Sequence, residues 1–273
     1  MVRMKSFKEE SGVSLMETLI ALFLTGLVVS AVFGAYIDQH KNMMIQDGIM
    51  NMQQNARASI DELGRFIRMA GHYLPIGIDP ISGTNSNPDT IVITFAIRQC
   101  NVVLQQNMSS PADQIRCDGQ DMTCLDGCSW AYIFDPDAGG GEFFKIGDIQ
   151  PAPERIILDT DPLSRAYESG CQVLPIQSIR YFVDNTDSTH PNLMMQVLGE
   201  DPVVYAEYVD DLQFQYRLRN GTVVDAPSVP SETREVLLTV VARTAIADYD
   251  FPDNPYRHAT YASKVNLRNL STW

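Results

Sequence analysis

The pattern of hydrophobic and polar positions divides the N-terminal part of the chain into a short polar segment and a long apolar one. Residues 1–12 read MVRMKSFKEESG, and from Val13 to Ile37 the sequence is apolar with a single ionised side chain, Glu17. About 20 consecutive apolar residues cross the hydrocarbon core of a bilayer as a helix. The pattern therefore predicts a leader at 1–12 and a transmembrane helix over residues 13–37.

Helical periodicity continues beyond the apolar run, because residues 38–70 lack proline and carry apolar residues at steps of three and four. These residues are Ile49, Met52, Ala56, Ile60, Leu63, Ile67 and Ala70. On the polar face, Asp61 and Arg65 have the spacing of an i,i+4 ion pair. Gly71 is expected to cap the helix, and Pro75 prevents its continuation. We therefore predict an amphipathic continuation over 38–71, and a helix from Val13 to Ala70 would be about 87 Å long.

The rest of the chain, residues 72–273, shows the periodicity of β-strands. After a turn-rich connection at 72–89, the predicted strands are 90–98, 131–135, 143–146, 155–159, 176–184, 193–198, 202–207, 209–219, 234–245 and 258–268. Within 212–219 apolar and polar residues alternate strictly, which indicates one buried face, and Asn220-Gly221 is a hairpin-turn signal. The predicted fold class is α+β, with a long N-terminal helix against antiparallel β-sheet in a β-rich globular domain.

Charge restricts the partners of this domain. The formal net charge of the chain is −14. Nucleic-acid binding requires a footprint of lysine and arginine, so no nucleic-acid partner is expected. Arg3, Lys5 and Lys8 precede the apolar run and favour a cytoplasmic N-terminus. The domain after residue 37 would then lie across the membrane, in the oxidising periplasm of a bacterium.

Cysteine chemistry follows from that topology. The five cysteines are Cys100, Cys117, Cys124, Cys128 and Cys171, all disulfide candidates in an oxidising compartment. Two bridges and one free thiol are the simplest expectation, with the pairing left open. A zinc site is the alternative, although the spacing of Cys117, Cys124 and Cys128 matches no common ligand pattern.

Other candidate chemistry is sparse. The acidic loop at 135–142 is interpreted as a solvated turn, with calcium binding as the alternative, because it lacks the EF-hand pattern. The sequence contains no G-x-S-x-G, H-E-x-x-H or phosphate-loop motif, and its four histidines are widely spaced. We therefore expect no catalytic residue, metal or cofactor. A membrane-tethered periplasmic enzyme remains the alternative of another class.

The junction between leader and apolar run resembles the class III signal of type IV pilins and pseudopilins. Gly12 directly precedes Val13, and Glu17 follows at the fifth position of the apolar segment. The resemblance implies cleavage between Gly12 and Val13 by a prepilin peptidase, N-methylation of Val13, and a role for Glu17 in assembly. Gly26 and Gly34 are either ordinary transmembrane glycines or positions where the helix melts inside a filament. A simple signal anchor carrying a stray Glu17 is the alternative.

The C-terminal half sharpens this resemblance. The segments IRYFVD, VDDLQFQYRL, REVLLTVVART and YRHATYASKVNLRNL are similar to the body of PilW-type minor pilins, including the LRN ending at 267–269. Membership of that group implies an inner-membrane protein that primes or caps a type IV pilus, without enzymatic activity. Its partners would be other minor pilins, the major pilin, the prepilin peptidase and a tip adhesin. A J-like minor pseudopilin of type II secretion is the alternative within the superfamily.

Overall fold

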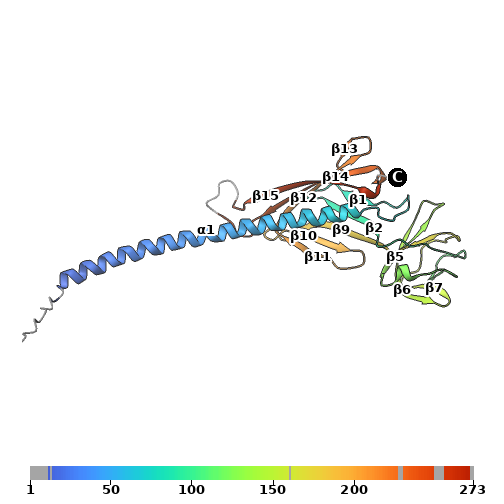
Figure 1. Cartoon of the computed structure of the whole chain (residues 1–273), viewed down its shortest axis with the longest axis horizontal. Helices are drawn as coiled ribbons and strands as arrows, with labels where there is room; N and C mark the ends of the chain where they lie inside the picture. The colour runs from blue at the N-terminus through green and yellow to red at the C-terminus, as the bar shows by residue number, and fades with distance from the viewer. Residues whose placement is uncertain (1–11, 13, 160, 227–229, 249–254, 271–273) are drawn as a thin grey trace, which may run out of the picture. The chain divides into compact units, whose positions relative to one another are not determined.

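The computed structural model of the chain describes residues 12, 14–159, 161–226, 230–248 and 255–270. Compact packing divides it into two units, residues 1–48 and residues 49–273. One helix, α1 (Leu15–Met69), contributes residues to both units (Figure 1). Its 55 residues correspond to about 82 Å at 1.5 Å per residue. The prediction of one long helix is confirmed for these bounds, whereas Val13 and the leader at 1–11 lie outside the described residues.

The second half of α1 is amphipathic, as its sequence predicts. Met52, Ala56, Leu63 and Ile67 are buried, and Ile49 is partly buried against the cluster that contains Met52 and Ala56. The predicted ion pair is wrong, because Arg65 contacts Glu62 at 2.8 Å rather than Asp61. The i,i+3 position places the longer glutamate side chain within bidentate reach of the guanidinium group.

The β-strands of the second unit form three antiparallel sheets. The five-stranded sheet has the order β1 (Ile81–Thr84), β2 (Thr90–Ala96), β9 (Ile176–Asp184), β10 (Asn192–Val197) and β11 (Val203–Glu207). The four-stranded sheet has the order β13 (Val223–Val224), β12 (Val209–Leu218), β14 (Thr233–Arg243) and β15 (His258–Asn266). The six-stranded sheet has the order β3 (Val102–Val103), β8 (Gln172–Leu174), β5 (Trp130–Asp135), β6 (Gly140–Pro151), β7 (Glu154–Leu158) and β4 (Gln114–Arg116). Three short 3-10 helices, η1 (Thr123–Leu125), η2 (Pro230–Glu232) and η3 (Arg268–Leu270), complete the described elements.

The five-stranded and four-stranded sheets share one hydrophobic core with α1. Leu63 and Ile67 of the helix lie in this core with Phe95 and Tyr181 of one sheet and Phe214 of the other. The alternation predicted for β12 is confirmed, since Leu212, Phe214 and Tyr216 are buried while Leu218 is only half-buried. At its two flanks, α1 contacts an edge strand of each sheet (Figure 1). The Tyr205 hydroxyl of β11 donates to the Ala58 carbonyl, and Arg57 lies over the Tyr261 ring of β15.

The six-stranded sheet encloses a separate core. Its buried residues include Leu104, Ile115, Ile133 and Ile156, which come from segments between residues 102 and 173. A smaller cluster contains Leu74 and Ile78 from the loop after α1, together with residues of β2, β5, β8 and β9, and so connects this sheet to the five-stranded one. The cysteine-rich segment 100–130 thus contributes β3 and β4 to a packed β-structure.

The structure also shows what the strand predictions missed. β1 lies in the segment predicted as a turn-rich connection, and β3, β4, β8 and β13 were not predicted. Each of these strands has four residues or fewer, which is too short for a period-two pattern. In β1, Gly83 lies against the Tyr216 hydroxyl, where an added Cβ atom would collide. Close contact between the two sheets explains why glycine occupies this strand position.

Candidate functional site

The candidate functional site is the N-terminal end of α1, where the sequence places Gly12, Val13 and Glu17. Gly12 is exposed, and a Cβ atom added to it would meet no atom within 4 Å. The Met16 backbone N–H donates to the Ser14 hydroxyl at 3.4 Å, so Ser14 caps the first turn of the helix. Val13 lies outside the described residues, and the structure therefore gives no geometry for the predicted cleavage bond. Gly12 itself is open to an approaching protein.

Glu17 lies in the first turn of α1 and is exposed. No hydrogen bond or ion pair links its carboxylate to another described residue of the chain. The helix macrodipole favours a negative charge in the first turn, but this effect is worth only about 0.3–1 kcal/mol. An isolated carboxylate in an apolar environment costs far more than that. Within the described chain, Glu17 thus lacks the cationic partner that burial would demand.

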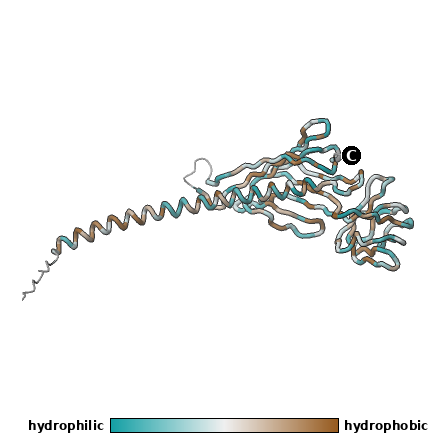
Figure 2. The backbone as a smooth tube through the Cα atoms, viewed as in Figure 1, coloured by the Kyte–Doolittle hydropathy of each residue, from teal (hydrophilic) through white to brown (hydrophobic). Residues whose placement is uncertain are grey.

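The residues of α1 around and after Glu17, as far as Ile37, are predominantly hydrophobic (Figure 2). Large apolar side chains from Leu15 to Ile37 are exposed, with fractions between 46% at Val29 and 78% at Leu15. The helix contains a window long and apolar enough to span a membrane, and no residue of that window is buried within the protein. Residues 15–37 of α1 therefore present an apolar helix surface with one carboxylate, Glu17, near the N-terminal end.

The serine and threonine hydroxyl groups between Leu15 and Ile37 are satisfied inside the helix. Thr18 donates to the Leu15 carbonyl at 2.8 Å, Thr25 to Ala21 at 2.7 Å and Ser30 to Gly26 at 2.8 Å. Lipid offers no hydrogen-bonding groups, so a polar side chain in a bilayer must find its partner within the protein. These three bonds make the stretch suitable for an apolar environment, and α1 continues unbroken through Gly26 and Gly34.

The disulfide expectation is only partly correct. Cys100 and Cys124 form a bridge, whereas Cys117, Cys128 and Cys171 are free, so the prediction of two bridges is wrong. Cys117 and Cys171 belong to one core but to different segments. The Leu104 N–H donates to the Cys171 carbonyl and the next N–H, from Gln105, donates to the Arg116 carbonyl. The segment 104–105 thus lies between the two cysteine-bearing segments and keeps them apart.

The free thiols are held in their neutral form by burial. Desolvation raises the pKa of Cys117 to about 12, with a smaller contribution from the Asp118 carboxylate. Desolvation also raises the pKa of Cys128 and of Cys171. Among the described residues, no group of three or more His, Cys, Asp or Glu side chains is arranged to hold a metal ion. The zinc alternative therefore gains no geometric support.

The acidic loop at 135–142 uses two of its carboxylates within the protein. Asp135 Oδ1 accepts the backbone N–H groups of Asp137 and Ala138 at 3.0 and 3.1 Å. Glu142 accepts the Ser164 N–H at 3.0 Å and the Tyr167 hydroxyl at 2.9 Å. Partial burial works to raise the pKa of Glu142, but the hydrogen bonds from Ser164 and Tyr167 outweigh it, so this pKa is lowered. The loop thus joins β5 and β6 as a structured turn.

The four histidines have different neighbours. His40 stacks on Tyr36 and His72 lies beside Tyr73. His190 stacks on Tyr208, and His258 contacts Asp210 at 2.8 Å. The Asp210 carboxylate also lies 3.4 Å from Arg243, which is nearly buried. Three of these histidines contact an aromatic ring and the fourth contacts Asp210, so the contacts do not assemble the histidines into one centre.

Comparison with known proteins adds no assignment. No family model matches the chain, and neither a curated protein nor a solved structure matches it.

Proposed function

We propose that this chain is a minor pilin that joins a type IV pilus through its N-terminal helix and primes or caps the filament. The observation that carries the proposal is the position of Glu17. It is an exposed carboxylate without a described partner, five positions after Gly12, at the start of an exposed apolar helix. This arrangement resembles the processing and assembly segment of type IV pilins.

The physical argument concerns the charge of Glu17. In a bundle of apolar helices, an unpaired carboxylate costs several kcal/mol, so it must acquire a cationic partner or lose its charge. Cleavage after Gly12 creates a cationic amine on Val13. The amine of a neighbouring subunit is the partner that a processed assembly supplies, and their contact fixes the axial register between the two helices.

The proposed location follows from the same segment. The leader carries Arg3, Lys5 and Lys8, which favour a cytoplasmic N-terminus. The chain would therefore be anchored in the inner membrane with the unit at 49–273 in the periplasm. The Cys100–Cys124 bridge is compatible with an oxidising compartment. Other minor pilins, the major pilin and the prepilin peptidase are the proposed partners. The six-stranded sheet offers additional surface for a tip adhesin.

A J-like pseudopilin of a type II secretion filament is the second candidate, because the Gly12 to Glu17 arrangement is common to the superfamily. The size of the six-stranded sheet favours a pilus protein over a secretion pseudopilin, because the sheet adds surface that a protein at the pilus tip can use for adhesion. An enzymatic function has no observation in its favour within the described residues.

Mass spectrometry of the N-terminal peptide tests the processing that the proposal requires. The chain is expressed in a strain with an active prepilin peptidase, and the mature protein is expected to begin with N-methylated Val13. Gly12→Val is expected to block cleavage because a β-branched side chain crowds the cleavage site. Gly26→Ala is the control, since a Cβ atom there meets no atom within 4 Å. A leader that remains intact in assembled wild-type material would refute the proposal.

A further inference from the structure

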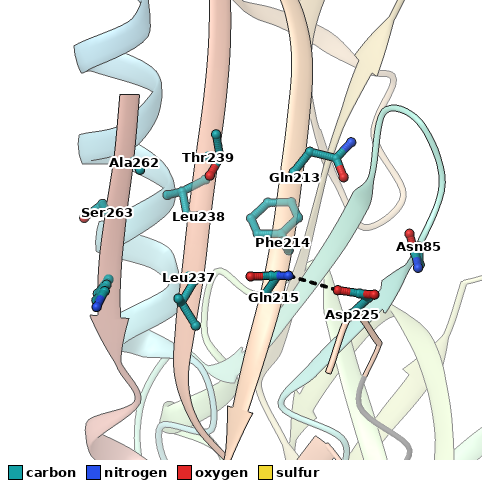
Figure 3. Close-up of a pocket in the computed structure, with 11 residues that line it drawn as sticks. Asn85, Gln213, Phe214, Gln215, Asp225, Leu237, Leu238, Thr239, Ala262 and Ser263 are labelled. Carbon is teal, nitrogen blue, oxygen red and sulfur yellow. Dashed lines mark hydrogen bonds between the residues drawn. The ribbon is translucent and has the colours of Figure 1, made fainter. Parts of the chain in front are cut away.

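A polar groove lies on the face of the four-stranded sheet that points away from α1 (Figure 3). The opposite face carries Phe214, Leu238 and Val265, which are buried in the core shared with the helix. The groove has a volume of about 430 Å³ and lies over β12, β14 and β15. Asp225, after β13, and Asn85, after β1, form one of its walls. Its volume is within the range of small-molecule sites in proteins.

The strand register defines the floor of the groove. Gln213, Thr239 and Ala262 form one row across the three strands, and Gln215, Leu237 and Lys264 form the next. Residues two apart on a strand point to the same face and lie about 7 Å apart, whereas three adjacent strands span about 10 Å. The groove is hollow at Thr239 and Ala262 because their side chains are small. Its floor has the dimensions of one sugar ring with its substituents.

The polar groups of the groove are oriented by contacts within the protein. Gln213 Nε2 donates to Asp211 Oδ1 at 2.9 Å, and Gln215 Nε2 donates to Asp225 Oδ1 at 3.2 Å (Figure 3). Since the amide nitrogens are engaged, the two amide oxygens are left as acceptors for a ligand, beside the Asp225 carboxylate. No described residue forms a hydrogen bond or ion pair with Lys264 Nζ or the Thr239 hydroxyl, so both can donate. The groove therefore combines oriented acceptors, free donors and a small apolar floor at Leu237.

We propose that this groove binds one monosaccharide unit of a glycan. Sugar hydroxyls donate and accept hydrogen bonds at once, which suits the amide oxygens of Gln213 and Gln215 and the donors at Thr239 and Lys264. The C–H face of the ring packs on Leu237 and Ala262. This binding activity is independent of the assembly role proposed for α1.

Other ligand classes fit the groove less well. A phosphate or nucleotide needs concentrated positive charge, whereas the lining offers Lys264 as its single cation, with the Asp225 carboxylate in the same groove. An apolar ligand would strip water from the two glutamines and Lys264 without replacing their hydrogen bonds. An extended peptide pairs with the free backbone groups of a sheet edge, and this groove lies across a sheet face.

Binding of the full chain to an array of immobilised oligosaccharides tests the proposal. The protein is kept in a detergent without a sugar headgroup, and the strongest saccharide on the array is then titrated by calorimetry. Ala262→Arg fills the groove from an exposed position and is expected to weaken binding at least tenfold. Thr260→Arg is the matched control. It lies two residues away on the same strand and face, outside the groove lining, and is expected to change affinity less than twofold.

Retention of a saccharide by the wild-type chain and by Thr260→Arg, but not by Ala262→Arg, would support the site. The proposal is overturned if no saccharide is retained, or if both arginine variants have the same effect. It is equally overturned if a peptide array, and not the saccharide array, shows binding that Ala262→Arg removes. Far-ultraviolet circular dichroism of each variant ensures that the compared proteins are folded.

Discussion

Asn269 donates a hydrogen bond from its side-chain nitrogen to the backbone carbonyl of Ala70 at 3.2 Å, across 199 residues of sequence. The same nitrogen lies 3.2 Å from the Arg68 carbonyl and 3.4 Å from that of Met69. The last carbonyl groups of a helix have no partner within the helix. Asn269 therefore caps the C-terminal end of α1 from the opposite end of the described chain.

Leu270 reinforces this cap from the next position. It is completely buried, and its side chain would meet a Cβ atom on Gly71 at 2.8 Å. Gly71 has a φ of +76°, the left-handed conformation that glycine adopts after a helix. The LRN segment thus joins the last strand of the four-stranded sheet to the end of α1.

Asn269→Ala is expected to destabilise the second unit by about 1–2 kcal/mol, because it leaves helix carbonyls without their donor. Urea unfolding of the full chain in detergent measures this change. Hydrogen exchange should also become faster at the Ala70 amide, which bonds to the Phe66 carbonyl in the last turn. Asn266→Ala, at an exposed position on β15, is the control and should stay within about 0.5 kcal/mol. Equal effects of the two substitutions would contradict the capping role.

Thiol counting tests the cysteine chemistry. Alkylation of the denatured, unreduced protein is expected to label the three free cysteines, and prior reduction should expose all five. In the native protein, half-buried Cys128 should react before the buried Cys117, whose pKa is raised to about 12 by desolvation. A single labelled thiol in the denatured, unreduced chain would reveal a second bridge and contradict the structure.

Glu142 makes the stability of the six-stranded sheet depend on pH. Because its pKa is lowered in the folded protein, the charged form stabilises the fold at pH values above the ordinary value of 4.5. This contribution is lost as the pH falls through the lowered pKa. We expect Glu142→Gln to be destabilising at pH 7 and nearly equal to the wild type in strong acid.

Unfolding curves of both proteins across this pH range measure the effect. Asp137→Asn, in the same turn but with an exposed side chain, provides the control and should show a smaller dependence on pH. A stability difference between Glu142→Gln and the wild type that stays constant with pH would exclude the carboxylate as its source.

The sequence predicts most of the elements whose patterns are long, but it predicts only residues 143–146 of the 12-residue strand β6. The helix, β9, β12, β14 and β15 each have enough residues for their periodicity to be recognised, and their observed bounds differ from the predicted ones by three residues or fewer. β3 and β8 have two and three residues, and each is a strand only because a distant partner pairs with it. No local pattern contains that information.

The sites divide in the same way. Gly12, Val13 and Glu17 lie close together in the sequence, so their spacing alone suggests a role in processing and assembly. The groove combines Gln213 of β12 with Lys264 of β15, and only the strand register places them on one floor. The cysteines illustrate the same limit, because the Cys100–Cys124 pairing depends on how the 100–130 segment folds. A contact that depends on how distant segments pair in the fold cannot be predicted from the spacing of residues along the sequence.

The most direct test of the assembly role is the number of pili formed by a strain that carries only the Glu17→Ala chain. Membrane insertion and cleavage should remain intact, because the substitution extends the apolar surface, and both are verified by fractionation and N-terminal mass. Thr18→Ala is the matched control, since among the described residues the hydroxyl it removes bonds to the Leu15 carbonyl alone. The account predicts few pili and reduced co-purification of other pilins for Glu17→Ala, an intermediate result for Glu17→Asp, and normal piliation for Thr18→Ala. Normal piliation by Glu17→Ala would contradict it.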